Sequence, residues 1–301
     1  MSKLDLHIHS EFSNDGEFSV GKIIEMCIQS GMKLISITDH NSVKSAAEAN
    51  KYDKVDLKII SGVELDCTYK GMDFHLLGYT FDYTNNDFRF IEEDIHDQEI
   101  QAAEKKISLF STATGIPVNN AEIIAAAKDG IVTGELIAEI ILVKENAQDY
   151  PVLQPYLPGG EKSDLPYVNM YWDFFSQGKA AYTPINYINL KDAIDLIHTS
   201  GGFSVLAHPG KTLGKYPGKN LNAYNSLLND ITSEGIDGIE VFSSYHSREE
   251  SEFFLDYAKQ NKLFISCGSD FHGKTKPSIQ IGGHGAFLED KELLKHLFPF
   301  S

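Results

Sequence analysis

The chain has 301 residues and a formal net charge of -17, and 42% of its residues are hydrophobic. Its length fits one α/β barrel or two small domains with a sizeable core. The acidic charge disfavours tight binding to long nucleic acid, which depends on Lys and Arg. The sequence contains no run of about 18 apolar residues, the length that a membrane-spanning helix needs. The three cysteines lie far apart in apolar runs and are expected in the core. We therefore expect a cytoplasmic protein that attracts any anionic substrate through local cations.

Strand-like apolar runs alternate with amphipathic stretches over residues 3–79. The predicted elements are a strand at 3–8, a helix at 19–30 ended by Gly31, a strand at 33–38, a helix from residue 42, and strands at 57–61 and 74–79. Such βα alternation is typical of a parallel sheet or barrel.

The pattern changes to helices with little strand signal after residue 84, and Pro151, Pro155 and Pro158 predict a loop at 150–160. The βα pattern then resumes with a helix at 190–199, a strand at 203–207, a helix at 221–233, a strand at 237–242, a helix at 247–261 and a strand at 263–267. We expect a small helical domain at residues 85–180, inserted into a discontinuous domain of residues 1–84 and 181–301.

Histidines and carboxylates gather at the ends of the predicted strands. The candidates are His7 and His9 at the first strand, Asp39 and His40 after the second, Glu64 after the third, His75 in or beside the fourth, His208 after 203–207, and Asp270 and His272 after the last. The carboxyl ends of parallel barrel strands meet on one face. These side chains are therefore predicted to form a single site.

The residue types at these positions suit divalent metals such as Mn, Fe and Zn, which accept imidazole nitrogen and carboxylate oxygen. His7 and His9 point to the same side of a strand because the side-chain period is two. A lone His-x-His pair is weak evidence, and Asp39-His40 alone fits a turn beside a helix cap equally well. The coincidence of five such groups at strand ends favours a metal site.

The same motifs resemble those of the polymerase and histidinol phosphatase (PHP) superfamily of metal-dependent phosphoesterases. The matching runs are His7-Ile8-His9 with Ser13-Asn14-Asp15-Gly16, Ile37-Thr38-Asp39-His40, Gly62-Val63-Glu64, His75-Leu76-Leu77-Gly78-Tyr79, Ala207-His208-Pro209 and Ser269-Asp270-Phe271-His272. They lie on both sides of the insertion, over about residues 3–84 and 183–285. The resemblance implies a distorted (β/α)7 barrel of the PHP type with an inserted small helical domain.

The resemblance also implies a metal centre of two or three divalent ions, which is trinuclear when all three sites are filled. One metal would take His7, His9, Glu64 and Asp270, a second would share Glu64 and add His75 and His208, and a third would take Asp15, His40 and His272. Histidinol phosphate phosphatases often have a histidine where this chain has Asp15, so the family's nucleotide-directed branch is favoured. That branch removes the 3'-phosphate of 3',5'-bisphosphonucleosides or trims short RNA from its 5' end. The run Gly134-Glu135-Leu136-Ile137-Ala138 stands where these relatives often carry an Arg-Pro-His-like run.

We expect hydrolysis by a metal-activated hydroxide, without a protein nucleophile. Asp39 is predicted to orient a ligand imidazole, with a turn or cap as the alternative. His246 is a candidate for phosphate contact or leaving-group protonation, and Arg248 for bidentate phosphate recognition, with surface positions as the alternatives. Glu240 ends a strand and either faces the site or forms a buried salt bridge.

Further substrate contacts are predicted from the loop after His208 and from the insertion. Lys211, Lys215 and Lys219 either hold a second phosphate or are solvated. The insertion aromatics have helical spacing, which fits helix packing or the stacking of a base: Tyr167, Tyr171, Trp172, Phe174 and Phe175.

The predicted function is a phosphoesterase acting on a small phosphorylated substrate, with a nucleotide favoured. A histidinol-phosphate-type or generic phosphatase is the first alternative. A metal-dependent amidohydrolase is the second, although such enzymes usually add a metal-bridging carboxylated Lys for which the sequence offers no clear candidate. A regulatory module with a silent metal site is the third, and the complete ligand set argues against it.

Overall fold

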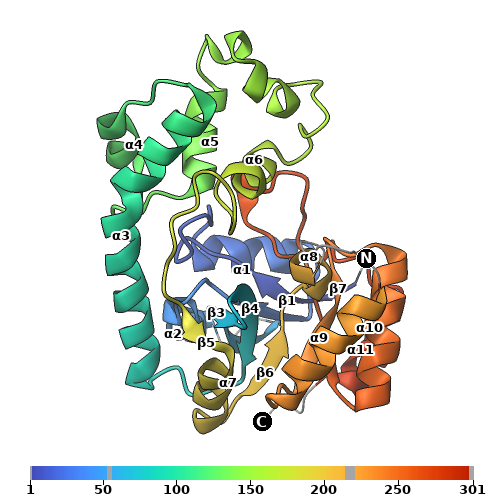
Figure 1. The fold of residues 1–301 in the computed structure, drawn as a ribbon. Coiled ribbons are helices and arrows are strands. Elements are labelled where there is room, and N and C mark those ends of the chain that lie inside the picture. Colours follow the sequence, from blue (N-terminus) through green and yellow to red (C-terminus); the bar gives the residue numbers. More distant parts are fainter. Residues whose placement is uncertain (1, 53–55, 214–220, 298–301) are drawn as a thin grey trace.

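A barrel-shaped sheet forms the centre of the molecule, with its strands in the order β1-β2-β3-β4-β6-β7-β8 (Figure 1). The structure is a computed structural model that describes residues 2–52, 56–213 and 221–297. The strands are β1 (Leu4–Ile8), β2 (Leu34–Ile37), β3 (Lys58–Tyr69), β4 (Met72–Tyr79), β6 (Phe203–Leu206), β7 (Gly238–Ser243) and β8 (Phe264–Gly268), with β5 (Ile188–Asn189) paired to β3. The first and last strands meet: the His9 N–H donates to the Phe271 carbonyl at 2.9 Å, and the Asp270 N–H donates to the His7 carbonyl at 2.8 Å. The predicted distorted (β/α)7 barrel is confirmed.

One strand of the barrel runs against the parallel arrangement that the sequence predicts. β4 is antiparallel to both β3 and β6. β3 also continues well beyond the predicted end at residue 61, because a tight turn at Lys70 and Gly71, both with positive φ, folds the chain back into β4. Glu64 therefore lies within β3 and not after it. The antiparallel return brings His75, at the start of β4, to the same barrel end as the parallel strands' carboxyl ends.

Helices cover the outside of the barrel (Figure 1). They are α1 (Val20–Gln29), α2 (Lys44–Ala49), α7 (Leu190–Thr199), α8 (Pro209–Leu213), α9 (Leu221–Ser233), α10 (Arg248–Asn261) and α11 (Asp290–His296). α1 begins at the N-cap Ser19 and is followed by Gly31 at φ 69°, as its sequence predicts. The three cysteines are free and buried, which confirms their placement in the core.

The insertion forms a helical lobe with a hydrophobic cluster of its own. Its helices are α3 (Asn86–Thr114), α4 (Asn120–Ala126), α5 (Gly134–Leu142) and α6 (Pro166–Phe174). In Figure 1, α3 runs beside the barrel and continues into this lobe. The cluster includes Ile107, Phe110 and Met170 and is separate from the clusters of the barrel. The Pro-rich segment differs from the expected loop, because Pro151–Tyr156 forms a 3₁₀ helix with Pro155 inside it.

Over the described ranges, no helix combines the length and the apolar character that crossing a membrane requires.

Candidate metal centre

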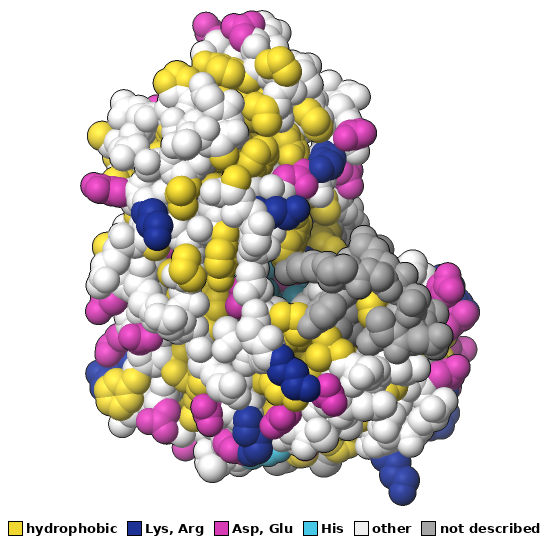
Figure 2. Space-filling view, viewed as in Figure 1, with side chains coloured by type: hydrophobic (Ala, Val, Ile, Leu, Met, Phe, Trp, Pro, Cys, Tyr) yellow, Lys and Arg dark blue, Asp and Glu magenta, His cyan; other side chains and the backbone are white. Residues whose placement is uncertain are grey.

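A cavity lies between the carboxyl end of the barrel and the helical lobe, and Figure 2 shows this hollow with histidine surface inside it. The barrel contributes histidines and carboxylates, which are residue types that bind metals, to the cavity wall. The lobe contributes aromatic, aliphatic and acidic side chains. The barrel residues include Asp15, His40, Glu64, Asp66, His75, His208 and Asp270, and the lobe residues include Glu99, Glu135, Tyr171, Trp172 and Phe175.

The first group of side chains consists of His7, His9, Glu64 and Asp270, all fully or almost fully buried. The Nε2 atoms of His7 and His9 lie 3.2 and 3.1 Å from Glu64 Oε2. They lie 3.4 and 3.1 Å from Asp270 Oδ1. Two imidazole nitrogens and two carboxylate oxygens thus converge on one point, which is a ligand set for a divalent metal.

A second group uses the other oxygen of Glu64. Glu64 Oε1 lies 2.8 Å from His75 Nδ1 and 3.0 Å from His208 Nε2. The two oxygens of one carboxylate therefore face two different sets of imidazoles. Such a carboxylate can bridge two metal ions.

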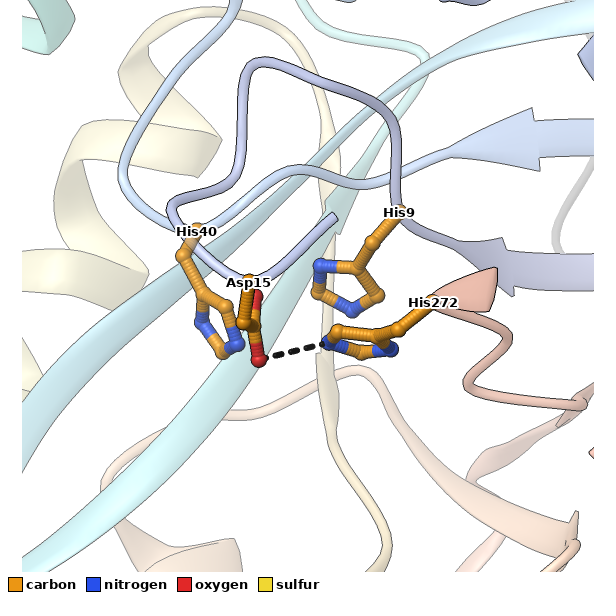
Figure 3. Close-up of side chains that lie close together, drawn as sticks. All are labelled: His9, Asp15, His40 and His272. Carbon is orange, nitrogen blue, oxygen red and sulfur yellow. Dashed lines mark ion pairs between the residues drawn. The ribbon is translucent and has the colours of Figure 1, made fainter. Parts of the chain in front are cut away.

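A third group, shown in Figure 3, consists of His9, Asp15, His40 and His272. Asp15 Oδ2 lies 3.1 Å from His272 Nε2, and the His9 and His272 rings are stacked with centroids 3.8 Å apart. The predicted trio of Asp15, His40 and His272 is thus brought together, and His9 joins it between the first and third groups.

Asp66 is a candidate ligand that the sequence interpretation missed. Its Oδ1 lies 3.3 Å from His40 Nδ1 and 3.3 Å from His75 Nε2, and the three side chains form a fourth compact group. Asp66 is two residues after Glu64 and pairs with His75 across the β3–β4 hairpin. The strand period of two could have pointed to it, had the strand been predicted long enough.

Glu240 is buried and fixes the orientation of two predicted ligands. Its Oε1 lies 3.0 Å from His7 Nδ1, and its Oε2 accepts the backbone N–H of His208 at 2.7 Å. The carboxylate favours a proton on Nδ1, so Nε2 is the ring nitrogen directed at Glu64 and Asp270. Burial opposes protonation of His7, but Glu64, Glu240 and Asp270 outweigh burial and raise the pKa of His7 well above its ordinary value, so a cation at Nε2 would displace a proton. Both alternatives for Glu240 apply, because its side chain reaches the cluster through His7 and forms a buried ion pair with that ring.

Asp39 acts on the imidazoles through Ser13, not through direct contact. Asp39 Oδ1 accepts a hydrogen bond from the Ser13 hydroxyl at 2.9 Å, and the Ser13 oxygen lies 2.9 Å from His9 Nδ1. The same oxygen accepts the backbone N–H of His40 at 3.0 Å. A hydroxyl that donates to Asp39 has only lone pairs left for His9, so the His9 Nδ1 carries the proton. The free Nε2 then points into the first group.

Burial keeps two ligand imidazoles neutral at pH 7. It lowers the pKa of His272 to about 3 and holds the pKa of His208 well below its ordinary value. Burial disfavours ionisation of Glu64, but the nearby imidazoles of His7 and His75 outweigh it and hold the pKa of Glu64 well below the usual range. Neutral imidazole and ionised carboxylate are the forms that bind metal.

His40 behaves differently from those two imidazoles. Burial opposes its protonation, yet the carboxylates of Glu64 and Asp66 outweigh burial and raise the pKa of His40 to about 10. Metal binding at this position therefore has to displace a proton.

Several buried polar atoms of the cluster have no hydrogen bond of standard geometry within the described part of the chain. They are Asp15 Oδ1, His40 Nδ1, Glu64 Oε2, Asp66 Oδ1, His208 Nδ1 and His272 Nε2. Each unsatisfied buried group costs about 1–3 kcal/mol. Carboxylate oxygens and imidazole nitrogens crowded in this way fit bound cations, which would satisfy most of them.

Two lysines reach the edge of the cluster. Lys276 Nζ lies 2.6 Å from Asp270 Oδ2, and Lys211 Nζ lies 3.7 Å from the same oxygen. Burial and the neighbouring Lys276 lower the pKa of Lys211 to about 8. Lys276 lies in a loop without strand or helix pattern, and no sequence signal pointed to it.

Glu135 faces the same cavity from the first turn of α5. Burial, together with the charge of Asp15, raises its pKa to about 7. Nearby, Lys106 donates to Glu99 Oε2 at 2.7 Å and to the Val132 carbonyl at 2.8 Å. Glu99 and Lys106 therefore neutralise each other, and the lobe's one cation among the described lining residues already has partners.

The two remaining predicted substrate contacts lie outside the cavity wall. His246 Nδ1 donates to the Val241 carbonyl at 2.9 Å, and its Nε2 accepts the Gly210 N–H at 3.0 Å. Both ring nitrogens are thus occupied in holding the turn after His208. Arg248 follows the Ser247 capping box as predicted, but it is exposed, pairs with Glu252 at 2.6 Å and stacks on Phe287.

Of the predicted basic loop, Lys215 and Lys219 lie outside the described residues. Of the five insertion aromatics, Tyr171, Trp172 and Phe175 line the cavity. Tyr167 and Phe174 pack against the lobe's own hydrophobic cluster, and Phe175 and Tyr171 also belong to it or pack against it. Helix packing therefore applies to four of the five aromatics, and Tyr171 and Phe175 combine it with a position in the cavity wall.

Known proteins resemble both halves of this architecture. Residues 5–153 match the family model of the PHP domain. The chain is 26% identical over 276 residues to a 5'-3' exoribonuclease of Haemophilus influenzae, covering 90% of each chain. It is 25% identical over 284 residues to a 3',5'-nucleoside bisphosphate phosphatase of Chromobacterium violaceum, covering 94% of this chain and 91% of that one. A solved structure from Bifidobacterium adolescentis, described as a candidate metal-dependent phosphoesterase, superimposes with a TM-score of 0.73 at 21% identity, over 98% of this chain and 94% of that one.

Proposed function

This chain belongs to the PHP family of metal-dependent phosphoesterases and is a phosphoric ester hydrolase, and from that premise we propose that it removes a phosphate from a small nucleotide. The observation that carries the proposal is Glu64, whose two oxygens face two sets of imidazoles at the bottom of a cavity. A carboxylate so placed could serve two cations, and paired metal ions promote the hydrolysis of phosphate esters.

We assign the metal ligands as the sequence predicts. His7, His9, Glu64 and Asp270 would hold one ion, Glu64, His75 and His208 a second, and Asp15, His40 and His272 a third, with His9 and Asp66 close enough to take part. Two or three ions of Mn, Fe or Zn suit these nitrogen and oxygen donors. When bound, they would supply an activated water and neutralise phosphate oxygens.

The chain's own residues have three tasks in this reaction. Glu240 and the Asp39–Ser13 pair hold His7 and His9 with the Nε2 lone pairs directed inward. Lys211 and Lys276 add positive charge beside Asp270, where an anionic substrate has to dock. The lobe of residues 85–180 acts as a cap that limits the access of water and contributes selectivity without supplying a metal ligand.

The preferred substrates are 3',5'-bisphosphonucleosides, from which the 3'-phosphate is removed, or short 5'-phosphorylated oligoribonucleotides. The relatives named for these two activities support this choice. Tyr171 and Trp172 give the cavity aromatic surface against which a base can stack. The acidic surface and the enclosed site favour small nucleotides over long nucleic acid.

Phosphate release from a substrate panel, measured with the metal content of the same sample, tests the proposal. The panel contains adenosine 3',5'-bisphosphate, AMP, a 5'-phosphorylated RNA tetramer, histidinol phosphate and an N-acyl amide. Activity on the nucleotides that depends on bound metal is the expected result. A preference for histidinol phosphate, hydrolysis of the amide alone, or no turnover by metal-loaded protein would reject it in favour of the corresponding alternative.

A further inference from the structure

The two lysines at the cavity share a single carboxylate oxygen. Lys276 Nζ and Lys211 Nζ lie 2.6 and 3.7 Å from Asp270 Oδ2. The other oxygen of Asp270 is turned toward the Nε2 atoms of His7 and His9. One carboxylate therefore serves two ammonium groups on one side and the imidazole cluster on the other, and it cannot neutralise both lysines.

Both ammonium groups are largely withdrawn from water. Lys276 is 5% exposed, and the side chain of Lys211 is 13% exposed. The ring of Tyr245 lies against them, with its centroid 3.9 Å from Lys211 Nζ and 5.4 Å from Lys276 Nζ. A buried cation is stable only when it is paired. Asp270 and, at longer range, Asp15 supply that negative charge to both lysines. Metal ions held by these carboxylates would leave the two ammonium groups to attract another anion.

The opposite wall differs in its charged side chains. Glu99 and Glu135 line the cavity from the lobe, and the ammonium of Lys106 is engaged by Glu99 and by the Val132 carbonyl. Glu99 and Lys106 neutralise each other in this ion pair, so the lobe offers an anion no unpaired cation among the described residues that line the cavity. Lys211 and Lys276 of the barrel wall are the lining cations that remain for a non-reacting anionic group of the substrate.

The cavity also places an aromatic ring of the lobe beside this cationic wall. Lys211 Nζ lies 5.3 Å from the centroid of Trp172, which lines the cavity from α6. A molecule that carries a phosphate and an aromatic base a few ångströms apart would find partners for both here. A nucleoside bisphosphate has that form.

We propose that Lys211 and Lys276, with Tyr245 packed behind them, form a subsite for the non-reacting phosphate of the substrate and direct the nucleoside beneath the lobe. This proposal rests on the proposed function and adds which side chains grip the second phosphate. It replaces His246 and Arg248, which lie outside the cavity wall, with two lysines that form part of it. The remote contact would position the reacting phosphate at the metal cluster.

The test compares adenosine 3',5'-bisphosphate with 3'-AMP, which lose the same phosphate and differ only in the 5'-phosphate. We would measure kcat/KM for both in the wild type and in the variants Lys211→Met and Lys276→Met. The wild type should prefer the bisphosphate, and each variant should reduce that preference by about 10- to 100-fold, as expected for loss of a hydrogen bond to a charged group. Lys211→Arg, which keeps the charge, should retain most of it.

Lys274→Met is the matched control. Lys274 is two residues from Lys276 but is exposed and pairs with Glu139 of the lobe at 2.8 Å, so its loss should leave the preference unchanged. Because Lys276 contacts Asp270, metal content is measured for every sample; the ratio between two substrates in one sample cancels a uniform loss of metal.

The outcomes separate this inference from the proposed function. If Lys211→Met and Lys276→Met lower both substrates equally, the lysines serve the reacting phosphate or Asp270, and the subsite is refuted. A wild type that hydrolyses both substrates without preference refutes it as well. If the metal-loaded wild type hydrolyses neither substrate nor any other phosphomonoester, the proposed function fails first.

Discussion

Replacing Glu240 by Gln should weaken metal binding although Glu240 is not itself a proposed ligand. The carboxylate faces two N–H donors, Nδ1 of His7 at 3.0 Å and the backbone N–H of His208 at 2.7 Å. The amide of Gln has one acceptor oxygen and one NH₂ donor, so one of these contacts becomes a repulsion between donors. If His7 moves its proton to Nε2 to relieve it, the ring loses the lone pair that faces Glu64 and Asp270.

The local packing leaves the amide no room to escape. Glu240 and His7 are both fully buried. The backbone of Gly268 also passes close to Glu240 Oε1, so close that a Cβ added to this glycine would lie only 2.7 Å from that oxygen. We expect metal affinity to fall by about 10- to 100-fold, the usual cost of losing such an orienting partner. The free energy of unfolding should fall by about 1–3 kcal/mol for one unsatisfied buried group.

Calorimetric metal titration, denaturant unfolding and kcat/KM at saturating metal would measure these effects. Glu252→Gln is the control, since it removes the same charge from an exposed ion pair with Arg248. Excess metal should restore much of the activity of Glu240→Gln. Wild-type metal affinity together with wild-type unfolding would show that Glu240 does not set the state of His7.

Three further predictions concern the metal ligands, the ions and the lobe. His40→Ala and Asp270→Ala should each nearly abolish phosphate release, while the circular dichroism spectrum stays close to that of the wild type. A variant that keeps its activity at saturating metal would show that the replaced residue is not a metal ligand. Chelation should abolish activity and lower the melting temperature, because bound ions stabilise only the folded chain; Mn, Fe or Zn should restore both, and an unchanged melting temperature would argue against a preformed site. Lys106→Met should lower the free energy of unfolding by about 3 kcal/mol, because Glu99 would lose its partner in a largely buried ion pair. Denaturant titration measures this loss. A loss below about 0.5 kcal/mol would mean that water screens the pair.

The barrel and the core of the site could be predicted because both follow from local patterns. Apolar runs mark the strands, and His7, His40, His208 and Asp270 follow them or end them. The direction of β4 could not be predicted, because an antiparallel strand in a parallel barrel has the same apolar pattern as a parallel one. That uncertainty also hid the true length of β3 and, with it, Asp66.

Side chains outside regular elements were the hardest to place. The capping box at Ser247 correctly predicted the start of α10, yet the direction of Arg248 depends on Glu252 and Phe287, which its own neighbourhood in the sequence does not single out. Lys276 presents the opposite case, since its loop has no periodicity and its contact with Asp270 arises from the tertiary fold. The local sequence pattern thus predicts candidate metal ligands on strands better than the positions of the long cationic side chains around them.

The pairing of the first strand with the segment after the last has a consequence for biosynthesis. His7 and His9 leave the ribosome about 260 residues before their neighbours Asp270 and His272. A nascent chain that ends before β8 has an open sheet edge at β1 and lacks two of the proposed ligands. Ions acquired earlier would meet only part of the proposed coordination sphere, so tight metal binding would have to wait until β8 and the segment after it have been translated. Premature termination anywhere before β8 should therefore yield a chain that cannot retain its metals.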